Sequence, residues 1–175
     1  WDRAARTWTL PQTTVSGSTF GARAVDVVVE SRDAGPPALS GGVALRAELD
    51  VLLDRHGSAV LWDAHSIRSH VPRLFAGDLP VLNLGTNDGR SCEEGLAARL
   101  LGYALGIPGC TAVLDGRFKG GYITRHYGNP AAGINAVQLE LAQRSYMDET
   151  SREYLPAAAR RIRPSLRALL EIAVE

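Results

Sequence analysis

The sequence lacks the features that would commit it to a membrane, a nucleic acid or an oxidising compartment. Its 19 basic and 19 acidic side chains balance, so we expect neither a nucleic acid nor a membrane surface as partner. No apolar run approaches the roughly 20 residues of a membrane span. Two cysteines are too few for a disulfide framework, which predicts a reducing, cytoplasmic compartment. Because 45% of the residues are hydrophobic, the chain has the composition of one ordinary globular domain over 1–175.

Extended segments alternate with helical ones along most of the chain, which predicts an α/β fold. Short apolar runs rich in branched side chains favour strands, with glycines and prolines between them. The expected strands are 25–29, 59–62, 81–84, 111–114, 122–124 and 136–141. Strands separated by helices indicate a layered sheet that is at least partly parallel.

Three helices are expected between and after these strands. Leucines at helical spacing favour a first helix that ends at His56, where Gly57 can stop it. Ser91 and Glu94 have the spacing of a capping box and predict the start of a second helix. A third, C-terminal helix is expected over 162–173, and Pro164 should either kink it or begin it.

The most informative part of the sequence is the decapeptide from Leu61 to His70, Leu-Trp-Asp-Ala-His-Ser-Ile-Arg-Ser-His. It continues an apolar strand into polar side chains, and open α/β sheets bind ligands at the carboxyl ends of their strands. Residues two apart in a strand point to the same face, so Asp63 and His65 lie together. A carboxylate beside an imidazole suits a metal site or a general base. The alternative is a hydrogen-bonded pair with a purely structural role.

A second cluster of polar side chains lies in residues 116–128. Three cations, one histidine and two tyrosines are interleaved there with four glycines. Glycine lets a backbone approach a ligand closely, and arginine binds carboxylates in a bidentate manner. In a chain without net charge, this concentration of cations favours a site for a small anion. A polar surface hairpin is the alternative.

Glu140 lies within the apolar strand Val137-Gln138-Leu139-Glu140-Leu141. Alternation places Gln138 and Glu140 on one face and the three apolar residues on the other. A desolvated carboxylate is a stronger base, which suits the activation of water. The alternative is a half-exposed strand whose glutamate faces solvent. If His65 and Glu140 are functional, their side chains should converge on one cleft at the same edge of the sheet.

Taken together, these segments resemble the N-formylglutamate amidohydrolase (N-formylglutamate deformylase) family. The matching motifs occur in the family's order and cover residues 43–175. They are Leu61–Ser69, Asn83-Leu84-Gly85-Thr86, Gly116–Gly121 followed by Ile123–Pro130, and Val137–Leu141.

The resemblance implies a zinc-dependent hydrolase that releases formate from N-formyl-L-glutamate at the end of histidine degradation. It also implies a three-layer α/β fold with a mixed sheet, similar to zinc carboxypeptidases (phosphorylase/hydrolase-like). In this reading, His65 is a zinc ligand and Glu140 activates the zinc-bound water. Arg125, and also Arg68, Arg117 and Tyr122, would bind the carboxylates of the substrate. Asp63 is either a further zinc ligand or a partner that orients His65.

The first 42 residues depart from the family pattern. A catalytic zinc needs three protein ligands, and the resemblance implies that two of them lie upstream, the first in a Pro-His-[Ala/Ser]-Gly turn after an early strand. No histidine precedes His56 here, and the nearest analogue of that turn is the segment 27–35, where Arg32-Asp33 stands in place of Pro-His. Alternatively, the segment 10–17 resembles a loop from the middle of the family's sequence, and the zinc-binding N-terminal region is then absent. We therefore expect residues 1–42 to be divergent or truncated, and the zinc ligand set to be incomplete. The alternative function is a non-catalytic relative that binds a small dicarboxylate or a protein partner.

Overall fold

The structure, a computed structural model, describes residues 39–175 of the chain, with side chains from Leu45 onward. The strand expected at 25–29 and the candidate ligand Asp33 lie outside the described residues. None of the helices in the described part is long and apolar enough to cross a membrane.

Four strands form one mixed sheet in the order β1-β4-β2-β3. The strands are β1 (Ala59–Ile67), β2 (Leu82–Gly85), β3 (Ala112–Leu114) and β4 (Ile134–Ala142). The two nine-residue strands β1 and β4 pair in parallel along their whole length, and β2 pairs in parallel with β3. In contrast, β2 runs antiparallel to β4. The expectation of a partly parallel sheet is therefore confirmed.

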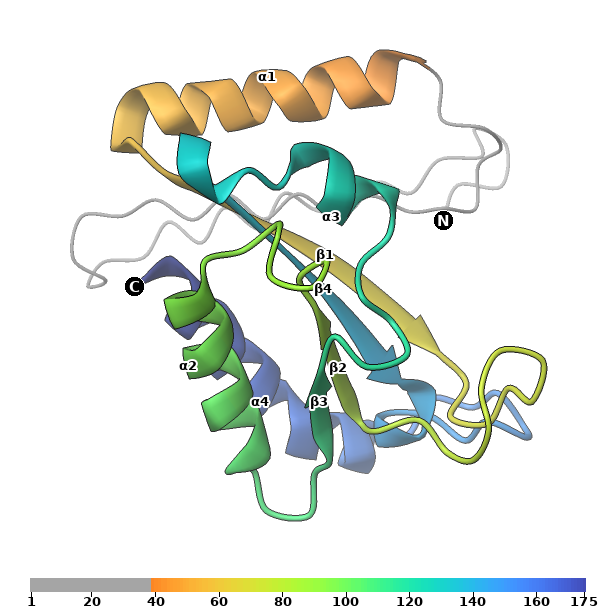
Figure 1. Cartoon of the computed structure of the whole chain (residues 1–175). Helices are drawn as coiled ribbons and strands as arrows, with labels where there is room; N and C mark the ends of the chain where they lie inside the picture. Colours follow the sequence, from red (N-terminus) through yellow and green to blue (C-terminus); the bar gives the residue numbers. More distant parts are fainter. Residues whose placement is uncertain (1–38) are drawn as a thin grey trace.

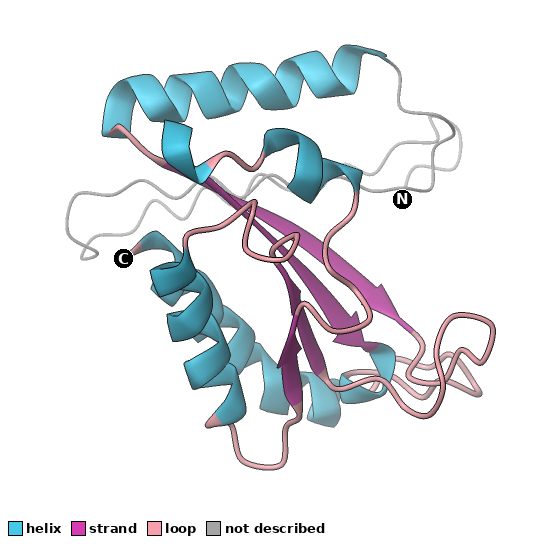
Figure 2. Cartoon of the chain, in the orientation of Figure 1, coloured by secondary structure: helices cyan, strands magenta, loops and turns pink. Residues whose placement is uncertain are grey.

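Helices cover both faces of this sheet, as Figures 1 and 2 show. The helices are α1 (Leu39–His56), α2 (Glu94–Leu105), α3 (Tyr122–Tyr127) and α4 (Pro156–Val174), with short 3-10 turns η1 (Pro130–Ala132) and η2 (Gln143–Ser145). Helices α2 and α4 pack on one face, and α1 and α3 lie on the other. The described residues thus have the expected helix–sheet–helix layering.

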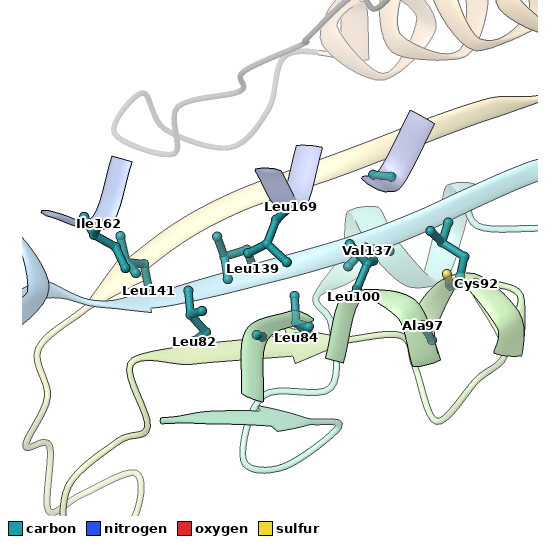
Figure 3. Close-up of a cluster of buried hydrophobic side chains, with 13 residues drawn as sticks. Leu82, Leu84, Cys92, Ala97, Leu100, Val137, Leu139, Leu141, Ile162 and Leu169 are labelled. Carbon is teal, nitrogen blue, oxygen red and sulfur yellow. The ribbon is translucent and has the colours of Figure 1, made fainter. Parts of the chain in front are cut away.

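The larger core lies between the sheet and helices α2 and α4 (Figure 3). Leu82 and Leu84 of β2 face it together with Val137, Leu139 and Leu141 of β4. Leu100 of α2 and Leu169 of α4 are fully buried against them. Alternation within each strand therefore sends one complete set of side chains into an apolar layer.

A smaller core lies on the opposite face, beneath α1 and α3. It forms at the amino ends of β1 and β4, where Leu61 and Ala136 are register partners. Leu49 of α1 and Tyr127 of α3 cover them. Beyond this cluster, toward the carboxyl ends of the strands, the same face becomes polar.

Residues 122–124 were expected to form a strand, and this expectation is wrong. They begin the helix α3, which follows the positive φ of 110° at Gly120. The helical period explains the result: Thr124 and Tyr127 are buried on one side, whereas Tyr122 and His126 stack on the exposed side. Spacings of three and four residues match a helix and not a strand.

Two helix starts also differ from expectation. The hydroxyl of Ser91 donates to the backbone oxygen of Ala136 at 2.8 Å and does not cap α2, which begins at Glu94 without a side-chain cap. Helix α4 begins at Pro156, a position that proline favours because its missing N–H is not needed there. Pro164 therefore lies inside the helix and does not begin it.

Candidate functional site

The strand pairing brings the polar residues of β1 and β4 to one place. Asp63 is the register partner of Gln138, and His65 is the register partner of Glu140. Register partners in parallel strands point to the same face, and all four of these residues lie opposite the apolar layer of α2 and α4. The prediction that His65 and Glu140 lie on one face of the sheet is confirmed, and their convergence on one cleft stays a prediction.

Asp63 and His65 interact directly. The Nε2 atom of His65 lies 2.7 Å from Oδ1 of Asp63. Only 8% of Asp63 is exposed, and its second carboxylate oxygen, Oδ2, is buried without a hydrogen-bond partner among the described residues. A carboxylate in this position fixes the orientation of the imidazole ring. The pair therefore presents a preoriented histidine beside Glu140.

Glu140 is buried, which excludes the alternative of a half-exposed strand with its glutamate in solvent. Glu140 is 8% exposed, and every residue of β4 is buried. Its backbone is also fixed, because Nδ2 of Asn83 donates to the carbonyl oxygen of Glu140 at 3.0 Å. The same nitrogen donates to the carbonyl oxygen of Pro80 at 2.8 Å. Sequence reasoning missed this use of Asn83, although an amide within an apolar strand is a signal for it.

The glycine-rich loop 116–121 crosses directly over the polar half of this face. A Cβ atom on Gly85 would lie 2.6 Å from the backbone nitrogen of Gly120, so only glycine permits this approach. The backbone N–H of Gly121 donates to Oε1 of Gln138 at 2.6 Å. At the other side of the loop, Asn87 N–H donates to the carbonyl oxygen of Lys119 at 2.6 Å. The loop is thus fastened to both β4 and the segment after β2.

The four residues expected to bind substrate carboxylates are all exposed. Tyr122 and Arg125 lie on α3, and Arg117 lies on the loop that follows β3. Nη1 of Arg125 donates to the carbonyl oxygen of Gly120 at 2.8 Å, which holds the arginine at the end of the glycine-rich loop. These three residues come from one continuous segment, whereas Arg68 comes from the segment that follows β1.

Arg68 belongs to a second group of contacts at the carboxyl ends of β1 and β4. Its Nη2 atom donates to the backbone oxygen of Glu149 at 2.7 Å. The carboxylate of Glu149 accepts hydrogen bonds from Ser69 N–H, Ser69 Oγ and Arg144 N–H, at 2.7, 2.7 and 2.8 Å. Glu149 therefore links the segment that follows β1 to the segment that follows β4. Sequence reasoning missed Glu149, because nothing local marks an acidic loop residue as a connector.

The neighbouring Asp148 stabilises the turn that presents Glu149. The backbone N–H groups of Ser151 and Thr150 donate to its carboxylate and lower its pKa.

The two cysteines have raised pKa values. Burial is the main cause of the increase for both thiols, and it raises the pKa of Cys92 to about 11. Both are free thiols, and neither belongs to the polar face.

The described residues do not contain a complete metal site. No group of three or more histidine, cysteine, aspartate or glutamate side chains in the described part is arranged to hold a metal ion. Within the described part, the best candidates for metal ligands are Oδ2 of Asp63, which has no hydrogen-bond partner there, and the adjacent His65. A zinc ion with three protein ligands would need at least one further donor from elsewhere.

Comparison with known proteins gives one consistent result. The sequence model of the family "N-formylglutamate amidohydrolase" matches residues 43–147, more than half of the chain. An N-formylglutamate deformylase from Pseudomonas putida is 62% identical over 106 residues, which are 61% of this chain and 40% of that protein. A second N-formylglutamate deformylase, from Pseudomonas aeruginosa, is 56% identical over 125 residues, 71% of this chain and 47% of that one.

A solved structure agrees with these sequence matches. The crystal structure of N-formylglutamate amidohydrolase from Ralstonia eutropha JMP134 is similar with a TM-score of 0.66 and 27% identity. The similarity covers 75% of this chain and 49% of that chain. The chain therefore spans less than half the length of these relatives.

Proposed function

Because the chain belongs to the N-formylglutamate amidohydrolase family, we propose that it takes part in hydrolysing N-formyl-L-glutamate to formate and L-glutamate. The observation that supports this best is the pairing of His65 with Glu140, next to the Asp63–His65 contact of 2.7 Å. An acid–base carboxylate and an oriented imidazole on one face are the groups that amide hydrolysis needs.

Glu140 is the proposed general base. It takes a proton from water as the water oxygen attacks the formyl carbon, and it returns the proton to the amide nitrogen as the C–N bond breaks. Its position on a strand paired on both sides, by β1 and β2, holds it rigidly. The backbone hydrogen bond from Asn83 adds to this rigidity. His65, oriented by Asp63, lies beside the reacting water in this proposal.

Zinc is the cofactor that the family resemblance implies, and the described residues alone do not fit a complete site for it. They supply His65, with Asp63 either as a further ligand or as its orienting partner. When bound, zinc lowers the pKa of a bound water and polarises a carbonyl group. The family resemblance also leads us to expect a fold similar to that of zinc carboxypeptidases. The low cysteine content leads us to expect a cytoplasmic protein.

Arg125 is the proposed main partner of the substrate carboxylates, with Arg117, Tyr122 and Arg68 as further contacts. Arg125 is exposed, and among the described residues its guanidinium group makes one hydrogen bond, from Nη1 to the carbonyl oxygen of Gly120. The rest of its guanidinium group is available for a bidentate contact with a carboxylate. The contact with Gly120 also places this cation at the loop that covers the polar face.

The test is formate release from N-formyl-L-glutamate by this chain, measured with and without added zinc. We expect Glu140→Gln to lower the rate about 100-fold or more, because it removes the base and keeps the shape of the side chain. Glu171→Gln, at an exposed position of α4, is the matched control and should leave the rate unchanged.

Three other outcomes would change the proposal. Binding of N-formyl-L-glutamate without formate release, at any zinc concentration, would favour the alternative of a non-catalytic dicarboxylate-binding relative. Formate release that survives Glu140→Gln unchanged would remove Glu140 from its proposed role. Binding of neither substrate nor glutamate would contradict the proposed function as a whole.

A further inference from the structure

Gln138 has a hydrogen-bond donor on the polar face of the sheet that no other described residue uses. It is the register partner of Asp63 and lies two residues before Glu140 on the same face of β4. Only 5% of the residue is exposed. On its other side, across the β2–β4 pairing, is Gly85, which has no side chain to fill the space next to it. The amide of Gln138 therefore lies in the middle of the proposed reaction site.

The orientation of this amide is fixed by the glycine-rich loop. The backbone N–H of Gly121 can only donate, so the atom that it contacts at 2.6 Å must be the oxygen of the Gln138 amide. Since oxygen and nitrogen occupy the two arms of the planar amide, Nε2 points away from Gly121. The loop thereby fixes which arm of the amide faces the rest of the polar face.

The Nε2 group makes no hydrogen bond within the described residues. The one hydrogen bond of Gln138 among the described residues uses its oxygen, and Oδ2 of the neighbouring Asp63 has no donor among them either. An amide NH2 group carries two donors, and donors that the protein leaves unused are available to a ligand oxygen.

We propose that the Nε2 group of Gln138 binds the formyl oxygen of the substrate and stabilises the negative charge that develops on it during hydrolysis. This inference rests on the proposed function and adds a residue to it. When water attacks the formyl carbon, one water proton passes to Glu140 and the carbonyl electron pair moves onto the formyl oxygen. A preoriented donor at that oxygen stabilises the adduct more than the substrate.

The remaining steps release the products and restore the carboxylate form of Glu140. The adduct collapses with cleavage of the C–N bond, and Glu140 gives its proton to the nitrogen. The products are L-glutamate and formic acid, whose proton passes through solvent to the released amine. Gln138 exchanges no proton in these steps, and its Oε1 stays bound to Gly121 throughout.

The experiment compares two ligands that differ in the formyl group. The side-chain 15N–1H signals of Gln138, assigned by through-bond experiments on the 13C,15N-labelled wild-type chain, are followed while the chain is titrated with N-formyl-L-glutamate or with L-glutamate. We expect the first ligand to shift these signals and the second to leave them in place. Calorimetric titration of the same samples gives the ratio of the two affinities.

The variants separate the donor from its surroundings. Gln138→Glu keeps an acceptor for Gly121 and removes the donor, so the preference for the formyl ligand should fall about fivefold to tenfold. Gln138→Met removes the donor without adding charge and should lower the preference similarly. Gln143→Glu adds the same charge just beyond β4 and should preserve the ratio.

The outcomes distinguish this inference from the proposed function. If both ligands bind but the Gln138 signals do not move, or if Gln138→Glu keeps the preference, the inference is wrong and the proposed function stands. If neither ligand binds to the wild-type chain, that result contradicts the proposed function itself, and the inference falls with it. Should both Gln138 variants fail to fold, the titration of the wild-type signals alone decides.

Discussion

The two faces of the sheet use the same strands for different purposes. On the face toward α2 and α4, residues such as Val137 and Leu139 are buried among leucines of both helices. On the opposite face, the intervening residues Gln138 and Glu140 are equally buried but polar, and a glycine-rich loop crosses above them. The comparison shows that one face supplies the hydrophobic stabilisation that permits the other to bury polar groups. Such burial has a free-energy cost that the polar face alone would not offset.

The largest effect that we expect concerns zinc on the polar face. With His65 and at most one carboxylate, Asp63 or Asp33, as ligands, the chain should bind zinc weakly or not at all, because each lost ligand removes much of the chelate affinity. We expect far less than one zinc ion per chain after dialysis against a mild chelator. His65→Ala should abolish any residual binding, and His56→Ala, exposed on α1, should not. Stoichiometric zinc after dialysis would mean that the polar face has ligands that we did not identify.

The second prediction concerns the apolar face. Leu100 is fully buried, so Leu100→Ala should lower the free energy of unfolding by about 2–5 kcal/mol, through lost burial and the cavity that remains. Urea unfolding followed by circular dichroism measures this. Leu105→Ala on the same helix is the control, because Leu105 is 60% exposed and should change stability by less than about 0.5 kcal/mol. Equal losses would show that the two positions are not packed as described.

The third prediction concerns recognition at the edge of the polar face. Arg125→Lys keeps the charge but loses the planar fork, so binding of N-formyl-L-glutamate should weaken about tenfold. Titration calorimetry on folded variants gives the two affinities. Arg160→Lys, at an exposed position of α4, should have no comparable effect. If wild type and Arg125→Lys bind equally, Arg125 has no part in the site and the segment 116–128 is only a polar surface.

The smallest effect is a pH dependence that belongs to the apolar face. Burial is the main cause that raises the pKa of Cys92 from 9.0 to about 11 in the folded chain. The folded state therefore binds more protons than the unfolded state between these two values, and stability should fall as pH rises from about 9 to about 11. The free energy of unfolding, measured at several pH values, should decrease less steeply for Cys92→Ala. An identical slope in both chains would contradict the raised pKa.

Much of the sheet could be predicted from the sequence because its strands are short apolar runs with clear ends. The alternation around Glu140 correctly separated the polar face from the apolar one, and the Asp63–His65 spacing correctly predicted a same-face pair. These predictions succeeded because a period of two residues is a local property. The resemblance to the family was carried by the same segments and is confirmed.

The predictions that failed depended on contacts between distant segments. Ser91 has the spacing of a helix cap, but its hydroxyl instead bonds the backbone of β4, 45 residues away. Residues 122–124 look extended because Tyr, Ile and Thr favour strands, yet packing of Thr124 and Tyr127 against the sheet makes them helical. The roles of Asn83 and Glu149 were missed for the same reason, since their partners lie far away in the sequence.

The uninterrupted pairing of β1 with β4 has a consequence for engineering. Nine consecutive register pairs set the separation of His65 and Glu140 through the backbone, independently of the loops that surround them. The proposed acid–base pair and the glycine-rich loop are therefore held by separate parts of the backbone. Replacing the segment 116–121 by loops of other lengths, while keeping Gly85 beneath it, would change the proposed substrate contacts and leave the strand pairing in place. A library confined to that loop would test whether ligand preference can be changed without disturbing the strands that position His65 and Glu140.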